Sequence, residues 1–271
     1  MAVEQVPENS KAGVVRLDRI GSVAQITLSR PAALNAITWT MYEQLEGHLE
    51  QLATDTAVRV VVLRGEGGRA FAAGTDISHF VGFTGQDGVA YERRLDAMVD
   101  RVAHLPQPVL AAVEGYAVGG GLLLTAACDL RYATPGAQFG APMARTLGNC
   151  LSLRNYQVLI AALGAMRTKE LLFTGRLLSA AEALSAGFLT AVLDTPDFSA
   201  RVLDIAHGIA EQAPLTQWAT KEAFRRLDAA QAARLEAVPF DDVVARVYGS
   251  ADFREGIQAH LQKRRAVWHG E

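Results

Sequence analysis

Three consecutive glycines, Gly119, Gly120 and Gly121, begin the segment GGGLLLTAAC, which carries no charge before Asp129. The apolar residues predict a helix, and glycine in the first turn of a helix costs roughly 1 kcal/mol relative to alanine. Local stability therefore does not explain these glycines. We expect another group to approach the backbone closely at this turn.

A second glycine-rich segment, GEGGRAFAAGTD, lies upstream at residues 65–76. Each segment follows an apolar run, VRVVVLRG at 58–65 and PVLAAVEG at 108–115, and both runs are typical of buried strands. A strand, a glycine turn and a helix thus follow one another at least twice.

The composition limits the classes of partner. The chain has 271 residues, half of them hydrophobic, and a formal net charge of -3 without a sustained basic run. We therefore expect a folded protein that binds neither nucleic acid nor a membrane. Cys128 and Cys150 form no CxxC pair and have no histidine at metal-ligand spacing, so neither a disulfide nor a metal site is expected. No basic and apolar leader precedes the first strand, which favours a cytoplasmic protein.

The remaining pattern predicts an α/β protein with a helical C-terminal region. Alternation around Ile20 and Gly21 predicts a β-hairpin over 14–29, and Thr38 is a plausible N-cap for a helix over 39–53. Residues 77–88 are polar and weakly patterned, so we expect a mobile segment before a helix over 90–104. Short strands are expected at DLRYAT (129–134), at AQFG (137–140) and over residues 189–194. Further helices are expected over 151–163, 167–174, 179–186, 198–212, 214–228, 231–247 and 250–264.

Two segments together closely resemble the signature regions of the enoyl-CoA hydratase/isomerase (crotonase) superfamily. They are AFAAGTD at 70–76, and GYAVGGGLLLTAACDLRYAT with AQFGAP at 115–142. Three further segments match the same superfamily in order and spacing: RPAALNAIT at 30–38 and the residues 171–192 and 252–265. The resemblance implies a spiral of β-β-α units, with an acyl-CoA-binding core over 1–200 and a helical trimerisation region over 201–271.

The resemblance also implies a site for an acyl-CoA thioester, with its carbonyl oxygen between the backbone N–H groups of Thr75 and Gly120. Neutral donors at a helix N-terminus stabilise an oxyanion, and removal of one such donor costs about 3 kcal/mol. Coenzyme A is expected as part of the substrate, with no permanently bound cofactor. The residues implied to contact it are Arg30, Ala33, Leu34, Ala36, Ala72, Ala73, Asp76 and Lys263.

For Lys263 and Asp76 a purely structural role is an alternative to CoA binding. Lys263 matches a phosphate-contacting lysine that in family trimers can come from a neighbouring chain, but it is equally typical of a solvated helix end. Asp76 directly follows the implied oxyanion residue, yet an aspartate there more often caps the next helix.

The sequence departs from the family where hydratases carry two glutamates. Those positions are Leu123 and Met143, and neither side chain can exchange a proton. Together with Gly119 they are expected to line a drier, apolar substrate pocket. This weighs against ordinary hydratase chemistry.

Two residues are the main candidates for the missing chemistry, besides Asn149 and Cys150, which are more typical of a turn and of a small buried side chain. Glu92 would be a relocated base if it were buried, because desolvation raises the pKa of a carboxyl group; beside Arg93 and Arg94 it is also typical of a solvated helix face. Arg145 could hold a substrate carboxylate or enolate, or could belong to a surface or interface ion pair.

The leading hypothesis is an acyl-CoA enzyme of the hydratase/isomerase type, acting in fatty acid metabolism as a lyase or isomerase through a thioester enolate. A decarboxylase is the alternative within enzymes, because loss of CO2 generates the enolate without a base. A non-catalytic acyl-CoA-binding protein is the alternative from another class. The resemblance implies a homotrimer or a dimer of trimers (a hexamer), while acyl length and exact reaction stay open.

Overall fold

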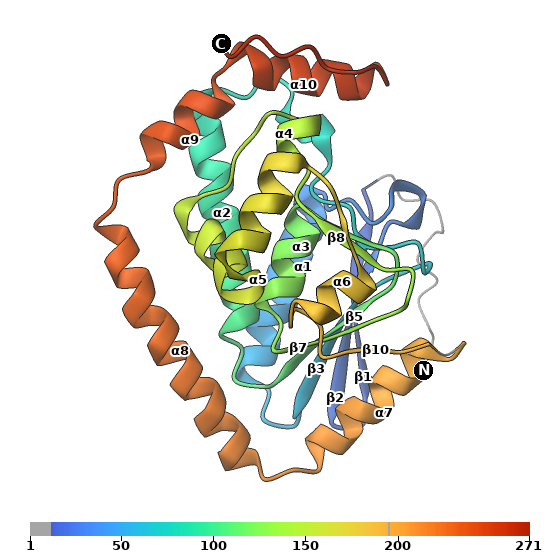
Figure 1. Cartoon of the computed structure of the whole chain (residues 1–271). Coiled ribbons are helices and arrows are strands. Elements are labelled where there is room, and N and C mark those ends of the chain that lie inside the picture. Colours follow the sequence, from blue (N-terminus) through green and yellow to red (C-terminus); the bar gives the residue numbers. More distant parts are fainter. Residues whose placement is uncertain (1–11, 195) are drawn as a thin grey trace.

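Two β-sheets form the centre of the computed structural model, which describes residues 12–194 and 196–271 (Figure 1). The larger sheet has the order β1 (Val14–Ile20), β2 (Val23–Ser29), β3 (Val60–Gly65), β5 (Val109–Val113), β7 (Leu130–Ala133) and β10 (Ala191–Val192). The smaller sheet has the order β4 (Ala70–Ala72), β6 (Tyr116–Val118), β8 (Gln138–Gly140) and β9 (Leu178–Ser179). Only the terminal pairs β1–β2 and β8–β9 are antiparallel among these strands.

Successive β-β-α units link the two sheets. β3, β5 and β7 lie in the larger sheet, and the strand after each, β4, β6 or β8, lies in the smaller one. A helix follows each pair, as α3 (Gly120–Ala127) follows β6. The expected α/β spiral of β-β-α units is confirmed. The sequence did not predict β4 and β6, because their three residues each lie beside glycines in segments that are typical of turns.

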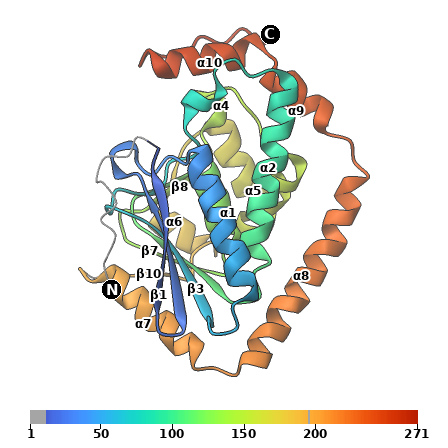
Figure 2. The same ribbon diagram turned by 180° about the vertical axis from the view of Figure 1, so that it is seen from behind.

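Helices cover both faces of the larger sheet. α1 (Trp39–Thr54) and α2 (Gly85–Ala103) lie side by side on one face, as Figure 2 shows. α7 (Phe198–Ala210) packs Phe198, Val202 and Ala206 against the opposite face. The expected domain boundary at 200 falls within α7 and stays a prediction. The other helices are η1 (Pro31–Ala33), η2 (Ile77–Phe80), α4 (Met143–Thr146), α5 (Leu153–Thr174), α6 (Ala180–Ser185), α8 (Pro214–Glu236), α9 (Asp241–Tyr248) and α10 (Ala251–Leu261).

Two helix predictions were wrong in their limits. α2 begins at Gly85 rather than at 90, because the side chain and backbone of Thr84 form a capping box with Asp87. α8 continues through residues 229 and 230, where the sequence analysis placed a break. The two helices expected over 151–163 and 167–174 are the two halves of α5, which Gly164 separates at a φ of 76°.

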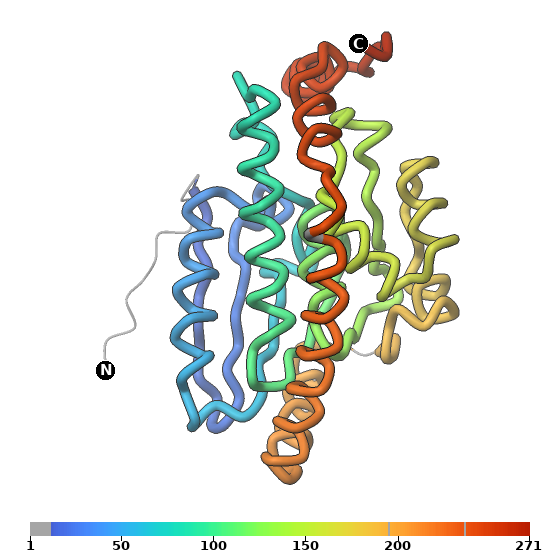
Figure 3. Tube along the Cα trace, turned by 90° about the vertical axis from the view of Figure 1, so that its left-hand side faces the viewer, coloured from blue at the N-terminus to red at the C-terminus, as the bar shows by residue number. Residues whose placement is uncertain are grey.

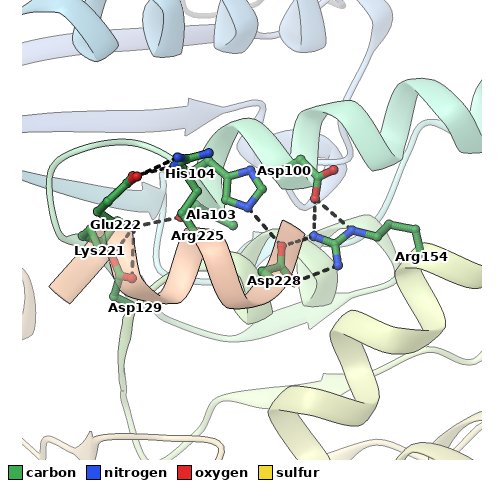
Figure 4. Close-up of polar contacts among 9 residues, drawn as sticks. All are labelled: Asp100, Ala103, His104, Asp129, Arg154, Lys221, Glu222, Arg225 and Asp228. Carbon is green, nitrogen blue, oxygen red and sulfur yellow. Dashed lines mark hydrogen bonds and ion pairs between the residues drawn. The ribbon is translucent and has the colours of Figure 1, made fainter. Parts of the chain in front are cut away.

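α8 runs along the outside of the molecule, from α7 at one end to α9 at the other (Figure 3). Lys221 holds it by an ion pair with Asp129 (2.9 Å) and by donating to the Ala103 carbonyl oxygen (2.9 Å). Arg154 on α5 binds Asp228 of α8 and Asp100 of α2 (Figure 4). Within the described residues, no helix is long and apolar enough to cross a bilayer.

Candidate active site

A cavity of about 210 Å³ lies where the two glycine-rich turns meet. Gly74 and Thr75 line it from the turn after β4, and Gly119 and Gly120 from the turn after β6. β4 and β6 pair in parallel, so both turns leave the smaller sheet at the same edge. The rest of the wall is formed by Ala73, Ile77, Phe80, Tyr91, Glu92, Leu95, Val118, Pro142, Met143, Thr146, Leu147, Asn149, Leu151 and His260.

Two backbone N–H groups of the wall lie outside the regular hydrogen-bond pattern. Gly120 is the first residue of α3, so its N–H group has no acceptor within the helix. The bridge between Ile37 and Thr75 uses the N–H groups of Ile37 (2.8 Å to the Gly74 oxygen) and Asp76 (2.9 Å to the Ile37 oxygen), and not that of Thr75. The amides of Thr75 and Gly120 are therefore available to a ligand.

The structure gives a specific reason for glycine at positions 119 and 121. A Cβ on Gly121 would lie 2.1 Å from the Ala72 carbonyl oxygen, so this glycine lets α3 pack directly against β4. Gly119 has a φ of 56°, which side-chain-bearing residues rarely adopt. The close approach that we expected is thus partly that of the protein's own β4, which sets the two turns next to each other.

Glu92 is the buried carboxyl group of this cavity, and its side chain is 2% exposed. Its Oε1 accepts a hydrogen bond from the Tyr248 hydroxyl (2.6 Å), and its Oε2 accepts one from the Ser152 backbone N–H (2.7 Å). Burial raises the pKa of Glu92 to about 7, although both hydrogen bonds favour the ionised form and oppose the rise. The carboxyl group can therefore both accept and donate a proton near neutral pH.

Thr75 also anchors a buried group of hydroxyls beside Glu92. Its Oγ1 lies 2.8 Å from the hydroxyl oxygen of Tyr42 and 2.8 Å from that of Tyr91. Burial raises the pKa of Tyr42 to about 12 and that of Tyr91 well above its ordinary value. Both phenols therefore stay protonated and act as fixed hydrogen-bonding groups.

The other predicted pocket residues divide into two groups. Met143 and Gly119 lie on the cavity wall as expected. Leu123 lies in the hydrophobic core at 1% exposure instead of on the wall, because it lies on the side of α3 that packs into the protein. Arg145 is exposed in the last turn of α4 and does not line the cavity either.

The predicted CoA loops lie next to one another. Ala73 donates its backbone N–H to the Leu34 carbonyl oxygen (3.0 Å), which joins the segment containing Ala33, Leu34 and Ala36 to the one containing Ala72 and Ala73. Arg30 forms an ion pair with Asp76 (2.6 Å), and Asp76 also caps η2 by accepting from the Ser78 N–H. Burial works against ionisation of Asp76, but the Ser78 bonds and Arg30 outweigh it and lower its pKa. Lys263 is exposed just after α10.

Sequence reasoning missed three residues of this region. Tyr248 and Ser152 hydrogen-bond Glu92 but lie 156 and 60 residues from it in the chain. His260 of α10 reaches the cavity wall from the C-terminal region. No sequence motif identifies these residues, because only the folded chain brings them to the cavity and to Glu92.

A group of metal-ligand types lies elsewhere, under α8, where Asp100, His104 and Asp228 converge. Arg154 donates to Asp100 (2.6 Å from Nη2) and to Asp228 (2.9 Å from Nη1), and His104 lies 3.0 Å from Asp228 (Figure 4). The guanidinium already supplies the positive charge between the two carboxylates. This group therefore acts as an ion-pair network that fastens α8.

Comparison with known proteins agrees with this geometry. The family model of enoyl-CoA hydratase/isomerase matches residues 18–271. The short-chain-enoyl-CoA hydratase of Clostridium acetobutylicum is 30% identical over 256 residues, covering 93% of this chain and 95% of the relative. The (E)-benzylidenesuccinyl-CoA hydratase of Thauera aromatica is 34% identical over 209 residues, covering 77% of this chain and 81% of the relative.

Solved structures show the same likeness. Methylmalonyl-CoA decarboxylase in complex with 2-nitronate-propionyl-CoA superposes with a TM-score of 0.85 at 29% identity, covering 95% of this chain and 99% of the other. An enoyl-CoA hydratase/carnithine racemase from Magnetospirillum magneticum gives a TM-score of 0.76 at 31% identity, covering 97% and 99%. The chain belongs to the enoyl-CoA hydratase/isomerase family.

Proposed function

We propose that the protein binds an acyl-CoA thioester, stabilises its enolate between the amides of Thr75 and Gly120, and moves the proton with Glu92. The observation that carries this proposal is the position of Glu92, a buried carboxyl group on the wall of the cavity that both amides line. In this family the expected substrate carries coenzyme A, so CoA enters as part of the substrate.

The two amides act on the oxygen where negative charge develops. The Gly120 N–H begins helix α3, whose dipole adds to the attraction. Because both donors are uncharged and held by backbone geometry, they need no reorganisation as the enolate forms. The apolar side chain of Met143 on the cavity wall offers water no hydrogen-bonding group, so water screens the attraction between the amides and the oxygen less.

One carboxyl group favours isomerisation of an enoyl-CoA over its hydration. Hydration commonly uses two carboxyl groups, whereas the corresponding positions here are Leu123 and Met143. A double-bond shift needs one: ionised Glu92 removes a proton from C2 of a 3-enoyl thioester, and the C–H electron pair forms the dienolate. The protonated Glu92 then returns a proton to C4, which gives the 2-enoyl thioester.

Decarboxylation is the second candidate, and the likeness to methylmalonyl-CoA decarboxylase favours it. Loss of CO2 would leave its electron pair on the enolate, and protonated Glu92 would supply the proton at C2. Arg145 no longer supports this reading, because it lies outside the cavity. His260 lies on the cavity wall, where its imidazole could donate a hydrogen bond to a substrate carboxylate.

The CoA moiety is proposed to lie against the joined loops of residues 30–36 and 72–76, with Lys263 contacting phosphate within the chain or across a subunit boundary. The proposal includes a homotrimer or a dimer of trimers. Exposed apolar side chains on α8 support self-association, since Leu215, Phe224 and Leu227 are 77%, 69% and 68% exposed.

The test is a comparison of three thioesters on one protein preparation: a 3-enoyl-CoA, a 2-enoyl-CoA and a malonyl-type CoA. The proposal expects the conjugated product to appear from the 3-enoyl substrate and Glu92→Gln to abolish it. Arg93→Gln is the matched control, because Arg93 is exposed on the same helix and pairs with Asp241. Release of CO2 alone would establish the decarboxylase. Binding of all three without turnover would establish a non-catalytic binder.

A further inference from the structure

Glu92 borders two cavities, not one. Besides the 210 Å³ cavity with the two amides, it lines a second cavity of about 700 Å³. The second one, here called the rear cavity, is open to solvent and is lined by α2, the start of α5, α8 and residues 238–244. Glu92 thus separates the space for the thioester from a larger space beneath α8.

The rear cavity is polar on the side of α2. Asp96 lies one turn after Glu92 and lines this cavity, and its Oδ1 accepts a hydrogen bond from the Ser152 hydroxyl (2.5 Å). The backbone N–H of the same Ser152 donates to Glu92 (2.7 Å). Ser152 therefore links the two carboxyl groups, and the cavity is large and polar enough to hold water between them.

The cavity that contains the Thr75 and Gly120 amides, here called the front cavity, offers no comparable route for water. Its volume of about 210 Å³ is small, so a bound acyl group displaces the water that could otherwise reach Glu92. His260 of α10 is the titratable side chain that shares the wall of this cavity with Glu92 and Tyr91. The other titratable and charged groups around Glu92 are Tyr42 of α1, Tyr91 and Asp96 of α2, Cys150 before α5, Tyr156 of α5 and Tyr248 of α9, and at the rear cavity Arg93, Asp100, Arg154 and Asp241.

We propose that Glu92 exchanges its proton with solvent through the rear cavity, with Asp96 as the group that receives it there. The inference rests on the proposed function, in which Glu92 carries a substrate proton. The O–H bond of protonated Glu92 breaks as a water in the rear cavity takes the proton, and a proton of that water passes to the carboxylate of Asp96. From Asp96 the proton reaches bulk water, and the reverse sequence protonates Glu92.

Such a route gives Asp96 a role that acts through Glu92 and not on the substrate. While the thioester stays bound, the proton taken from the substrate can be replaced by one from solvent. Without the route, Glu92 would return the same proton to the substrate. The origin of the transferred hydrogen therefore reports on the route directly.

The test measures deuterium incorporation into the 2-enoyl product when the 3-enoyl-CoA is converted in D2O. Wild type is expected to incorporate solvent deuterium, and Asp96→Asn to reduce the incorporation per turnover about tenfold. Asp96→Ala should regain incorporation when formate is added, because this small carboxylate fits the space left in the rear cavity. Asp241→Asn is the matched control, since Asp241 lines the same cavity but pairs with Arg93.

A second variant avoids the carboxyl groups. Leu235 of α8 lines the rear cavity, and Leu235→Trp is expected to fill part of it while leaving both carboxyl groups in the chain. It should also lower deuterium incorporation, so the proposal stays testable even if Asp96→Asn fails to fold. Unchanged incorporation in a folded, active Asp96 variant or in Leu235→Trp overturns the route.

The two proposals fail in different ways. Full activity of Glu92→Gln would refute the proposed function. Loss of activity in Glu92→Gln together with wild-type incorporation in Asp96→Asn would refute only the route through the rear cavity.

Discussion

Glu92 and Asp100 lie on the same helix, two turns apart, and yet their surroundings are opposite. Glu92 accepts hydrogen bonds from uncharged donors, the Tyr248 hydroxyl and the Ser152 N–H. Asp100 faces the guanidinium of Arg154, which it shares with Asp228. The first carboxyl group lies beside neutral donors at a cavity with free amides, and the second is part of the fastening of α8.

The difference appears in the pKa values. Burial raises the pKa of Glu92 to about 7. Burial acts on Asp228 in the same direction, but Arg154 and then His104 outweigh it and lower the pKa of Asp228. A cation beside the partly buried carboxylate of Asp228 therefore fixes it as an ion-pair residue, whereas neutral donors leave the buried Glu92 able to exchange protons near pH 7.

The largest effect is expected for Glu92→Gln. Removal of a general acid/base group lowers kcat by about 10²–10⁴-fold. In the wild type, kcat should rise with pH through about 7 if proton removal by ionised Glu92 limits the rate, because only the ionised form accepts a proton. A pH–rate profile of wild type and variant checks this, and a variant that keeps both rate and profile contradicts the role.

Gly121→Ala tests the backbone side of the cavity. The new Cβ would lie 2.1 Å from the Ala72 oxygen, so α3 and β4 must separate, at a cost of about 3 kcal/mol in unfolding free energy. The displaced Gly120 amide should also lower activity. Urea unfolding and the enzyme assay measure the two effects. Gly136→Ala is the control, because its Cβ would meet nothing within 4 Å, and equal stabilities of the two variants would disprove the packing argument.

Arg154→Met tests the other region. It leaves Asp100 and Asp228 without their shared cation, and we expect a loss of about 2–3 kcal/mol, reduced because both aspartates are about one third exposed. Thermal or urea unfolding measures it. Arg226→Met, which removes a largely exposed partner of Glu222, should change stability by less than about 0.5 kcal/mol. A similar small change for Arg154→Met would show that the network does not fasten α8.

The pH dependence of stability should separate the two kinds of carboxyl group. The folded pKa of Glu92 lies above its ordinary value of 4.5, so the native state binds more protons and stability falls as pH rises from about 5 to 7, by about 2 kcal/mol. Glu92→Gln should remove the part of this fall between about pH 6 and 7, while burial of Asp96, which raises its pKa to about 6, leaves a fall at lower pH. The lowered pKa of Asp228 has the opposite sign, and its stabilisation is lost as pH falls below about 4. Parallel unfolding curves for wild type and Glu92→Gln from pH 5 to 8 would contradict the burial of an ionisable group.

Local patterns predicted most of the fold. The hairpin of β1 and β2, the strands β3 and β5 and the cap at Thr38 all follow from residues close in sequence. Predictions were wrong where a side chain at a helix end or a very short strand decided the limits, as at Thr84 and in β4. These features depend on single hydrogen bonds or on pairing with distant strands, which periodicity does not contain.

The sequence by itself determined the two glycine turns, the absence of both usual glutamates at Leu123 and Met143, and Glu92 as one of two candidates to replace them. Only the tertiary structure decided where those candidates lie, since α2 buries Glu92 against the cavity while α4 leaves Arg145 exposed. It also brought Ser152, Tyr248 and His260 to the site. The physical reason is that burial and hydrogen bonding of a carboxyl group depend on neighbours from distant parts of the chain.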